Sequence, residues 1–406
     1  MQNGEKIIYI DYTRSIPRGS TSYHGGANYT NHILAELQKS KYEGYKFILL
    51  WPKGYTPRES AEESLYNNGF FIIQEIESLS DVGKLEKGST LFTPVIDRPI
   101  PVSKQKSDYS VVRKIKKENP TVYIIATIFD MRWQYNGQEL LDRYYFSGKK
   151  YYFSFIHKSA LWVFNNIYSK PSVKRGLPAI DKVFTISNFS LQQIIAYNKN
   201  AEIIPHYLSI LDRKSAGERN PDCNYFLFVS GNRPIKNFLR TLSAFCDFKK
   251  TDKNNYYLYV TGLNEQTFNN LQRYKKIDKT IVRDYVRVHN YVDDETLDSL
   301  YKNCSVFLYT SKYEGFGLPI LEAAKHGRPS ISSFKSSIPE VLGCAAYYIN
   351  PSNISSIQKG MVYMTQEHVL KQYETWVSLN YPILEQKMKL DFDVVLEHLG
   401  ISDAEI

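Results

Sequence analysis

One nine-residue segment, Glu314–Glu322, constrains the fold of this chain more than any other stretch. An apolar run typical of a strand, Val306–Tyr309, comes shortly before it. Pro319 suits the first turn of a helix, because its missing N–H would have no partner there. Gly327 stands where a helix cap is expected. The pattern predicts a buried strand, a glycine-rich loop and a helix over about 318–326, a unit typical of parallel α/β sheets.

The same segment indicates a binding site. The backbone N–H groups of Gly317, Leu318 and Ile320 are expected to point out of the helix start, where a phosphate is attracted. The two glycines of the loop would let that phosphate approach the backbone closely. Glu314 and Glu322 repel phosphate, so we expect them to bind hydroxyl groups, one on a sugar and one on a ribose. Together these features predict a site for a sugar nucleotide.

Short apolar runs alternate with helical patterns in both halves of the chain, which is typical of parallel α/β sheets. The expected strands are Ile7–Ile10, Phe47–Trp51, Phe70–Gln74, Thr90–Val95, Thr121–Phe129 and Lys182–Ile186, then Tyr225–Ser230, Tyr256–Val260, Val286–Tyr291, Ser305–Thr310 and Pro329–Phe334. The expected helices include Ala27–Gln38, Ser159–Tyr168, Phe189–Tyr197 and one from Asn237 to about Lys249. Ser187 or Asn188, and later Asp293 or Asp294, suit helix N-caps. The polar stretch 211–224 is predicted to be a linker.

Several spaced motifs resemble one known family. Glu-x7-Glu with an internal Gly-Phe-Gly-Leu-Pro is similar to the signature of family 4 retaining glycosyltransferases (glycosyl transferases group 1), which have the GT-B fold. The run 322–329 resembles the Glu-Ala-x-x-x-Gly-x-Pro of that family, and 336–341 and 345–351 resemble the family's next segments along the chain. The resemblance implies an α/β chain with two Rossmann-like domains facing each other across a cleft. An acceptor-binding domain would cover 1–205 with a crossover helix at about 376–399, and a nucleotide-sugar-binding domain would cover 206–375.

The resemblance also implies roles for individual residues in the second half. Arg233 and Lys236, which come after Gly231, stand where relatives neutralise the donor diphosphate. Fixed cations there stabilise the negative charge of a leaving nucleotide. The alternative is that both are plain surface cations. The donor site would be completed by Gly315, Phe316, Gly317 and Leu318, with Glu314 on the sugar, Glu322 on the ribose, and Gly262 and Tyr291 beside the base.

The first half carries weaker signals. Gly25 and Gly26 resemble a family loop that approaches the donor phosphate, although a simple turn explains them equally well. Asp130 ends an apolar strand where relatives often carry His-Asp. This chain has Phe129 in the place of that histidine, which leaves a histidine role there without support. Asp130 stays a candidate for acceptor contact or base catalysis, with a helix cap as the alternative.

Composition limits the partners and cofactors. The net charge of +9 keeps a polyanion-binding or nucleic-acid-binding protein as the alternative from another class. No aromatic-basic strand motif favours nucleic acid, so we expect none to bind. The four cysteines form no Cys-x-x-Cys pair, and no Asp-x-Asp loop is apparent, so neither a metal nor a cofactor is expected beside the donor substrate. Every apolar run is too short to span a bilayer. A cytoplasmic location is therefore expected, with peripheral attachment to the inner membrane face left open.

The sequence therefore predicts transfer of a sugar from a nucleotide donor to a glycan or lipid-linked acceptor. Retention at the anomeric carbon and a place in bacterial surface polysaccharide synthesis come from the resemblance alone. Catalysis is assigned to Glu314, Lys236, Arg233 and Asp130. A sugar-nucleotide epimerase on the same fold and an inactive glycan-binding relative stay as alternatives. Neither the donor sugar, the base, the acceptor nor the oligomeric state can be inferred from the sequence.

Overall fold

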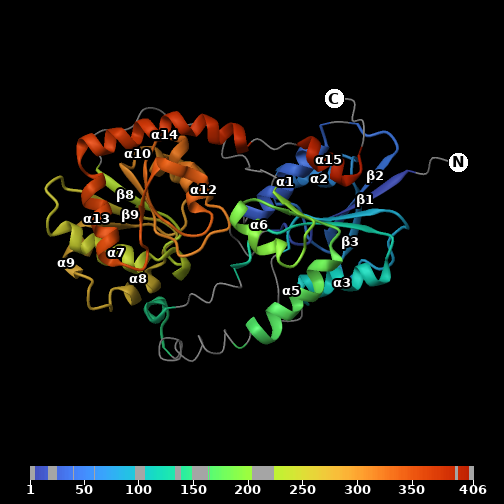
Figure 1. The fold of residues 1–406 in the computed structure, drawn as a ribbon, viewed down its shortest axis with the longest axis horizontal. Helices are drawn as coiled ribbons and strands as arrows, with labels where there is room; N and C mark the ends of the chain where they lie inside the picture. The colour runs from blue at the N-terminus through green and yellow to red at the C-terminus, as the bar shows by residue number, and fades with distance from the viewer. Residues whose placement is uncertain are drawn as a thin grey trace. The chain divides into compact units, whose positions relative to one another are not determined.

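The chain forms two α/β units (Figure 1). The computed structural model describes residues 5–16, 25–39, 41–58, 60–96, 106–132, 139–148, 163, 165–203, 224–388 and 392–401. Unit 1 contains Met1–Gln134, Phe164–Ser209 and Met388–Ile406, and unit 2 contains Tyr135–Val163 and Ile210–Lys387. Each unit therefore includes segments that are distant in the sequence.

Unit 1 is built on a seven-stranded parallel sheet in the order β3-β2-β1-β4-β5-β6-β7. Its strands are β1 (Lys6–Asp11), β2 (Tyr45–Pro52), β3 (Ile72–Ile76), β4 (Thr90–Thr93), β5 (Tyr123–Thr127), β6 (Lys182–Thr185) and β7 (Ala201–Ile203). Its helices are α1 (Gly25–Leu37), α2 (Ser60–Asn67), α3 (Asp108–Glu118), α5 (Lys170–Gly176), α6 (Asn188–Ile195) and α15 (Phe392–Leu399), with the short turns η1 (Leu79–Asp81), η4 (Asn165–Ser169) and η5 (Leu177–Ala179).

Unit 2 is built on a six-stranded parallel sheet in the order β10-β9-β8-β11-β12-β13. Its strands are β8 (Tyr225–Phe228), β9 (Tyr257–Val260), β10 (Val286–Val288), β11 (Val306–Tyr309), β12 (Ser330–Ser333) and β13 (Ala346–Ile349). Its helices are α7 (Phe238–Lys249), α8 (Glu265–Leu271), α9 (Lys279–Tyr285), α10 (Asp294–Asn303), α11 (Leu318–Lys325), α12 (Ile338–Leu342), α13 (Ile354–Met364) and α14 (Glu367–Met388), with the short turns η3 (Leu140–Tyr145), η6 (Pro234–Lys236) and η7 (Gly343–Ala345).

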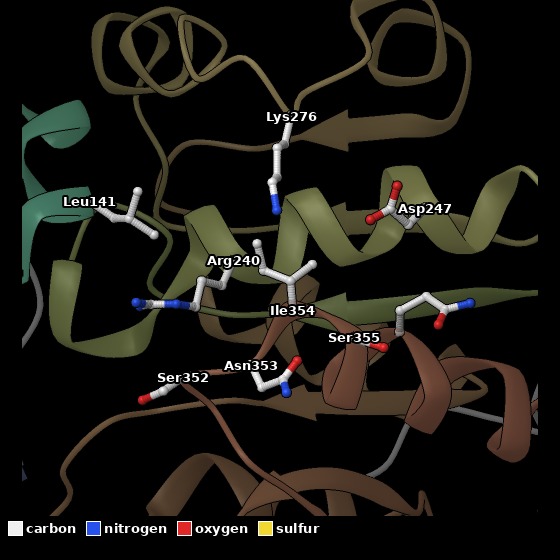
Figure 2. Close-up of a pocket in the computed structure, with 9 residues that line it drawn as sticks. Leu141, Arg240, Asp247, Lys276, Ser352, Asn353, Ile354 and Ser355 are labelled. Carbon is white, nitrogen blue, oxygen red and sulfur yellow. The ribbon is translucent and has the colours of Figure 1, made fainter.

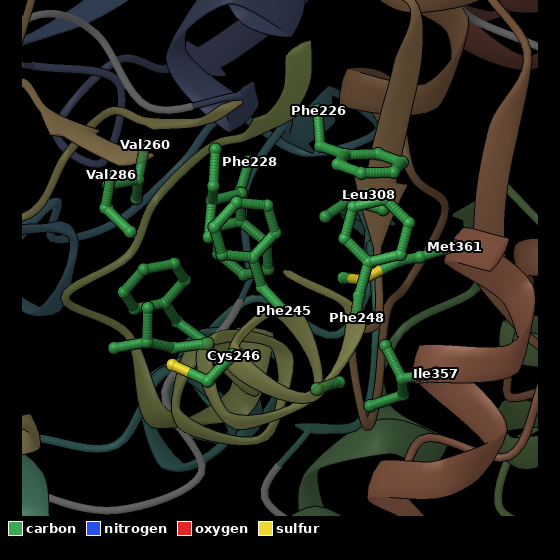
Figure 3. Close-up of a cluster of buried hydrophobic side chains, with 14 of the residues drawn as sticks. Phe226, Phe228, Phe245, Cys246, Phe248, Val260, Val286, Leu308, Ile357 and Met361 are labelled. Carbon is green, nitrogen blue, oxygen red and sulfur yellow. The ribbon is translucent and has the colours of Figure 1, made fainter. Parts of the chain in front are cut away.

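The core of unit 2 explains why its central strands β8 and β11 are apolar on both faces. All four residues of β8 and all four of β11 are buried. Phe226 and Phe228 of β8 lie against Phe245 and Phe248 of α7, as Figure 3 shows. Met361 extends the same cluster from α13, which packs beside α7. Burial on both faces leaves β8 and β11 no polar side, whereas β9 alternates half-buried and buried residues.

Most of the predicted elements are confirmed, with small corrections. The strand expected at Phe70–Gln74 instead runs over Ile72–Ile76. The N–H of Phe70 is taken by the side chain of Asn68 at 2.9 Å, which delays the start of strand pairing. Ser187 caps α6 as expected, accepting a hydrogen bond from the N–H of Ser190. The strands β7 and β13 were not predicted from the sequence.

Within the described residues, the expected domain boundaries differ from the units of the structure in two places. Residues 139–148, expected in the first domain, belong to unit 2, because Tyr144 and Tyr145 are buried in its core. The expected crossover at 376–399 is split, because α14 continues to Met388 and lies in unit 2 as far as Lys387. Of the two helices in this range, α15 is the one that contributes to the core of unit 1, through side chains such as Val395.

Two further predictions fall mainly where the chain is not described. The linker expected at 211–224 lies outside the described residues except for its last position. The helix expected at Ser159–Tyr168 lies mostly outside them, and its described end forms the π-helical turn η4.

Candidate functional site

The loop between β11 and α11 has the predicted strand-loop-helix form. Gly317 precedes the helix with φ of +128°, a conformation that side-chain-bearing residues avoid. A Cβ at this position would also lie 3.1 Å from the side chain of Ile320. The N–H of Gly327 bonds to the carbonyl of Ala324 at 2.8 Å and closes the helix, which confirms the predicted cap.

One expectation about this loop is wrong. The N–H of Ile320 was expected to point out of the helix start, but it donates to the carbonyl of Gly317 at 3.0 Å. The tight turn at Gly317 brings its carbonyl back over the first helical turn, so this donor is already used. The anion-binding N–H groups expected here are reduced to those of Gly317 and Leu318.

The centre of the site is a buried ion pair. Lys236, at the end of the short turn after β8, donates from Nζ to Glu314 Oε1 at 2.7 Å and to the hydroxyl of Tyr309 at 3.1 Å. The Lys236 side chain is 6% exposed and that of Glu314 is 15% exposed. Two residues 78 positions apart are thus joined at the carboxyl ends of neighbouring strands. This burial contradicts the surface-cation alternative for Lys236.

The surroundings of the pair determine its charge. Burial raises the pKa of Glu314, but Lys236, the Ser311 hydroxyl and the Arg233 guanidinium stabilise the carboxylate, and the pKa ends below its usual range. The pKa of Tyr309 is raised well above its usual range by burial and by the nearby Glu314 carboxylate. The site therefore presents an ionised glutamate beside a neutral phenol at neutral pH.

Asn237 ties together the loops that carry the pair. It has φ of +70° and comes directly after Lys236. Its side-chain amide donates to the carbonyls of Thr310 at 3.2 Å and Pro351 at 2.8 Å. The N–H of Lys312 donates to the carbonyl of Ile235 at 2.9 Å, which joins the two loops again. The loops that follow β8, β11 and β13 are therefore joined to one another by hydrogen bonds at the site.

Two serines support the Glu314 loop from the end of β12. The hydroxyl of Ser336 accepts from the N–H of Glu314 at 2.8 Å. The hydroxyl of Ser337 donates to the carbonyl of Phe316 at 2.7 Å. This serine pair lies in a motif that resembles the family, but no role was predicted for it from the sequence. A signal was present, because both hydroxyls come after a buried strand on the same side of the sheet as the glutamate.

Gly231 and Gly262 lie where the loops after β8 and β9 meet. The N–H of Asn232 donates to the carbonyl of Gly262 at 2.8 Å, and Gly231 donates to Thr261 at 3.0 Å. Gly262 has φ of +62°, and a Cβ there would lie 3.1 Å from the Cα of Ser230. The two glycines that were predicted to border the base therefore lie in loops whose backbones are in close contact.

The remaining predicted residues of unit 2 differ in exposure. Arg233 is exposed but lies near enough to Glu314 to lower its pKa. Glu322 is half-buried on α11, where its carboxylate helps burial raise the pKa of Tyr301. Tyr291 is 68% exposed in the loop after β10, whereas Phe316 is 9% exposed and its ring packs inward.

The predicted residues of the first half belong to unit 1. Gly25 and Gly26 form the first turn of α1, and the Gly26 carbonyl accepts from the hydroxyl of Thr30 at 3.0 Å. Asp130 comes after β5 and pairs with Arg132, accepting from its backbone N–H and its guanidinium, each at 2.8 Å. Asp130 is thus bonded to Arg132, which has helical conformation at the end of a described range, so the helix-cap alternative stays open.

Unit 2 also contains a pocket of about 670 Å³ beside the site loops (Figure 2). Leu141 of η3, Arg240 of α7 and the segment Ser352–Ser355 line it. None of the predicted site residues lines this pocket, although Ser352 comes after Pro351, whose carbonyl is bound by Asn237.

Two kinds of feature are absent from the described part of the chain. Within the described residues, no three His, Cys, Asp or Glu side chains gather as metal ligands would. Among the helices in the described ranges, none is long and apolar enough to cross a membrane.

Similarity to known proteins extends over both halves of the chain. Residues 211–376 match the family described as glycosyl transferases group 1. O-antigen chain mannosyltransferase B of Escherichia coli is 27% identical over 221 residues, which cover 51% of this chain and 58% of that protein. O-antigen chain mannosyltransferase RfbU of Salmonella typhimurium is 28% identical over 251 residues, covering 61% of this chain and 64% of that protein. The matches thus span less than two thirds of either relative.

A solved structure supports the fold over the whole length. HepE of Anabaena, in complex with UDP and glucose, has a TM-score of 0.58 to this chain at 12% identity, covering 98% of each. The likeness shows the GT-B fold class, with two Rossmann-like units, in agreement with the two parallel sheets. Residues 211–376 of the chain are thus similar to the group 1 glycosyltransferases, and the curated relatives that it matches are named as mannosyltransferases.

Proposed function

We propose that this chain transfers a sugar from a nucleotide-sugar donor to a hydroxyl of a glycan or lipid-linked acceptor in bacterial surface polysaccharide synthesis. The observation that carries the proposal is the buried pair of Lys236 and Glu314 where β8 and β11 end. Ligands of open parallel sheets bind at this end of the strands. The relatives named as O-antigen mannosyltransferases support the polysaccharide pathway.

The diphosphate of the donor would be held by cations and amides. Arg233 and Lys236 supply the positive charge, and the N–H groups of Gly317 and Leu318 lie at the start of α11. Lys236 is already fixed by Glu314 and Tyr309, so it needs little reorganisation when the leaving nucleotide gains charge. The same fixed charge would bind the ground state less strongly than the transition state.

The two glutamates would bind hydroxyl groups. Glu314 would position the sugar and stabilise positive charge at the anomeric carbon, because its lowered pKa keeps it ionised. Glu322, half-buried on α11, would accept from the ribose. Gly231, Gly262 and Tyr291 would border the base.

We further propose retention of the anomeric configuration. The bond between the anomeric carbon and the phosphate oxygen breaks while the acceptor oxygen bonds to the same face. The acceptor proton passes to the leaving phosphate oxygen, so no protein base is required in that step. Asp130 is kept as a candidate for contact with the acceptor. Because Arg233 and Lys236 supply the charge, we expect transfer without an added divalent metal.

Mannose is the first sugar to test, because both sequence relatives are named mannosyltransferases. Glucose is the natural competitor, because the HepE structure contains UDP and glucose.

The experiment is nucleotide release from GDP-mannose, UDP-glucose and other nucleotide sugars, with and without EDTA. Glu314→Gln is the test variant. Glu367→Gln is the control, because Glu367 forms an exposed pair of the same 2.7 Å length with Lys371. We expect release from one donor, lost in Glu314→Gln and kept in Glu367→Gln. Proton NMR of the product sugar then reads the anomeric configuration.

Equal release by the enzyme and by Glu314→Gln would overturn the assigned role of the glutamate. An inverted product would overturn retention while leaving the donor site in place. Absence of release, with no shift in thermal stability on adding any nucleotide, would overturn the donor site itself.

A further inference from the structure

The segment Glu139–Tyr145 comes from the first half of the sequence but packs in unit 2. It lies between β5 and β6 along the chain, yet Tyr144 and Tyr145 are buried in the core of the second sheet. The hydroxyl of Tyr145 accepts from the N–H of Leu239 at 3.0 Å. Leu239 is in the first turn of α7, whose preceding residue Asn237 provides no side-chain cap. Tyr145 therefore caps the helix that begins just after Lys236.

The same segment also reaches the Glu314 loop. Lys312 donates from Nζ to Asp142 Oδ1 at 2.6 Å, and both residues are 6% exposed. Glu139 lies 3.5 Å from the same ammonium. Lys312 precedes Glu314 by two residues. A buried charge without its partner is costly, so this pair strongly favours one position of the loop.

A third contact joins the segment to the Lys236 side. Arg240 forms an ion pair with Glu139 and donates to the side chain of Asn237 at 3.1 Å. Figure 2 shows Arg240 on α7 and Leu141 on η3 bordering the same pocket. The segment thus contacts the chain next to both members of the Lys236–Glu314 pair.

We propose that Asp142 is a positioning residue for Glu314, acting through Lys312, and that the segment 139–145 holds Lys236 and Glu314 in their productive geometry. The inference rests on the proposed function, because it assigns Glu314 to the donor sugar. A displacement of about 1 Å at such a residue lowers rates by about 10²-fold even when the altered residue is distant from the chemistry.

The kinetic test compares Asp142→Asn with a matched control. Asp142→Asn keeps the shape of the side chain and removes its charge. Asp252→Asn breaks another buried Lys–Asp pair of 2.6 Å, at the far end of α7 with Lys249. We expect kcat for nucleotide release to fall by at least about tenfold in Asp142→Asn with little change in KM. Lys312→Met should lower kcat by a similar factor. In the double variant Asp142→Asn/Lys312→Met, kcat should fall no further than in either single variant.

A second test needs no substrate. The unfolding equilibrium of the full chain is measured for Asp142→Asn, Glu314→Gln and the double variant. Positioning predicts that the two changes are coupled by at least about threefold in the unfolding equilibrium constant. Asp252→Asn combined with Glu314→Gln should be additive, because Asp252 shares no contact in the described structure with the site loops.

The outcomes separate the two proposals. Unchanged kcat in folded Asp142→Asn, or additive unfolding effects with Glu314→Gln, would show that the Asp142–Lys312 pair only stabilises the fold and would overturn the inference. If no nucleotide sugar is a substrate, the proposed function fails. The unfolding cycle would still decide whether Asp142 positions Glu314.

Discussion

The two sheets differ in where some of the carboxylates at their strand ends find partners. In unit 1, Asp130 pairs with Arg132, and the Asp11 carboxylate accepts from Thr13, each only two residues away. In unit 2, Lys236 bonds to Glu314 across 78 positions. In these examples unit 1 uses local turns and unit 2 uses a buried long-range pair, although unit 1 also has a buried long-range contact at the end of β5, between Thr127 and Tyr29 at 3.0 Å.

This difference shows which strand ends are preorganised. A turn closed by its own neighbours forms whether or not the sheet is complete. A buried lysine 78 positions from its glutamate is fixed only when β8 and β11 lie side by side. The fixed charges of unit 2 are thus a product of its tertiary fold, which suits a site that must stabilise developing charge.

The largest expected effect comes from breaking the long-range pair. Lys236→Met should lower nucleotide release by roughly 10²–10³-fold. It should also cost about 3–5 kcal/mol of unfolding free energy, because Glu314 stays buried without its partner. Urea unfolding and initial rates measure both. The double variant Lys236→Met/Glu314→Gln should recover stability but not activity, and equal stability of single and double variants would contradict the comparison.

Acid should remove the contribution of the same pair. The pKa of Glu314 is below its ordinary value of 4.5 in the folded protein. A lowered pKa means that the unfolded chain binds the proton first, so the stability from ionisation is complete above about pH 4.5 and is lost as the pH falls through the folded pKa. The stability difference between the protein and Glu314→Gln should be constant from pH 7 to about 5 and shrink below that. A constant difference down to pH 3 would argue against an ionised pair.

A smaller effect is expected from the close approach of loops in unit 2. Gly262→Ala should cost about 1–2 kcal/mol for its left-handed backbone and more for the contact with Ser230 at 3.1 Å. Gly88→Ala in unit 1 is the control, because Gly88 has φ of +79° with nothing within 4 Å of an added Cβ. Thermal unfolding should rank the two variants in this order. Equal losses would show that backbone conformation alone matters.

The smallest stability effect is expected at the local turn of unit 1. Asp130→Asn removes the charge that pairs with Arg132, whose side chain is 52% exposed. Its unfolding free energy should change by no more than about 0.5 kcal/mol. Any fall in transfer rate would then report a direct role of Asp130 at the acceptor. A loss of stability as large as that of Lys236→Met would remove the contrast between the units.

The sequence predicted the fold well because the fold depends on local patterns. The apolar runs of β8 and β11, Pro319 at the helix start and Gly327 at its end each act within a few residues. Short edge elements such as β7, with three residues, carry too little pattern to be recognised.

The site was predicted in its residues but not in its connections. Lys236 and Glu314 were placed by motif, yet their direct bond depends on which strands are neighbours. The contact between Asp142 and Lys312 spans 170 positions and could not be foreseen, since the expected boundary put Asp142 in the other domain. The hydrogen bond from the N–H of Ile320 to the carbonyl of Gly317 was not predicted, because it depends on the backbone conformation of Gly317.

The interrupted layout of the chain has a consequence for its biosynthesis. Unit 1 is closed by α15, whose Val395, Leu396 and Leu399 fill a core shared with β1 and α1. A ribosome delivers these side chains only after every strand of unit 2 has been made. During synthesis, part of the apolar surface of unit 1 therefore stays exposed to solvent until unit 2 has been translated. Truncation before residue 392 should thus harm the part of the protein that was synthesised first.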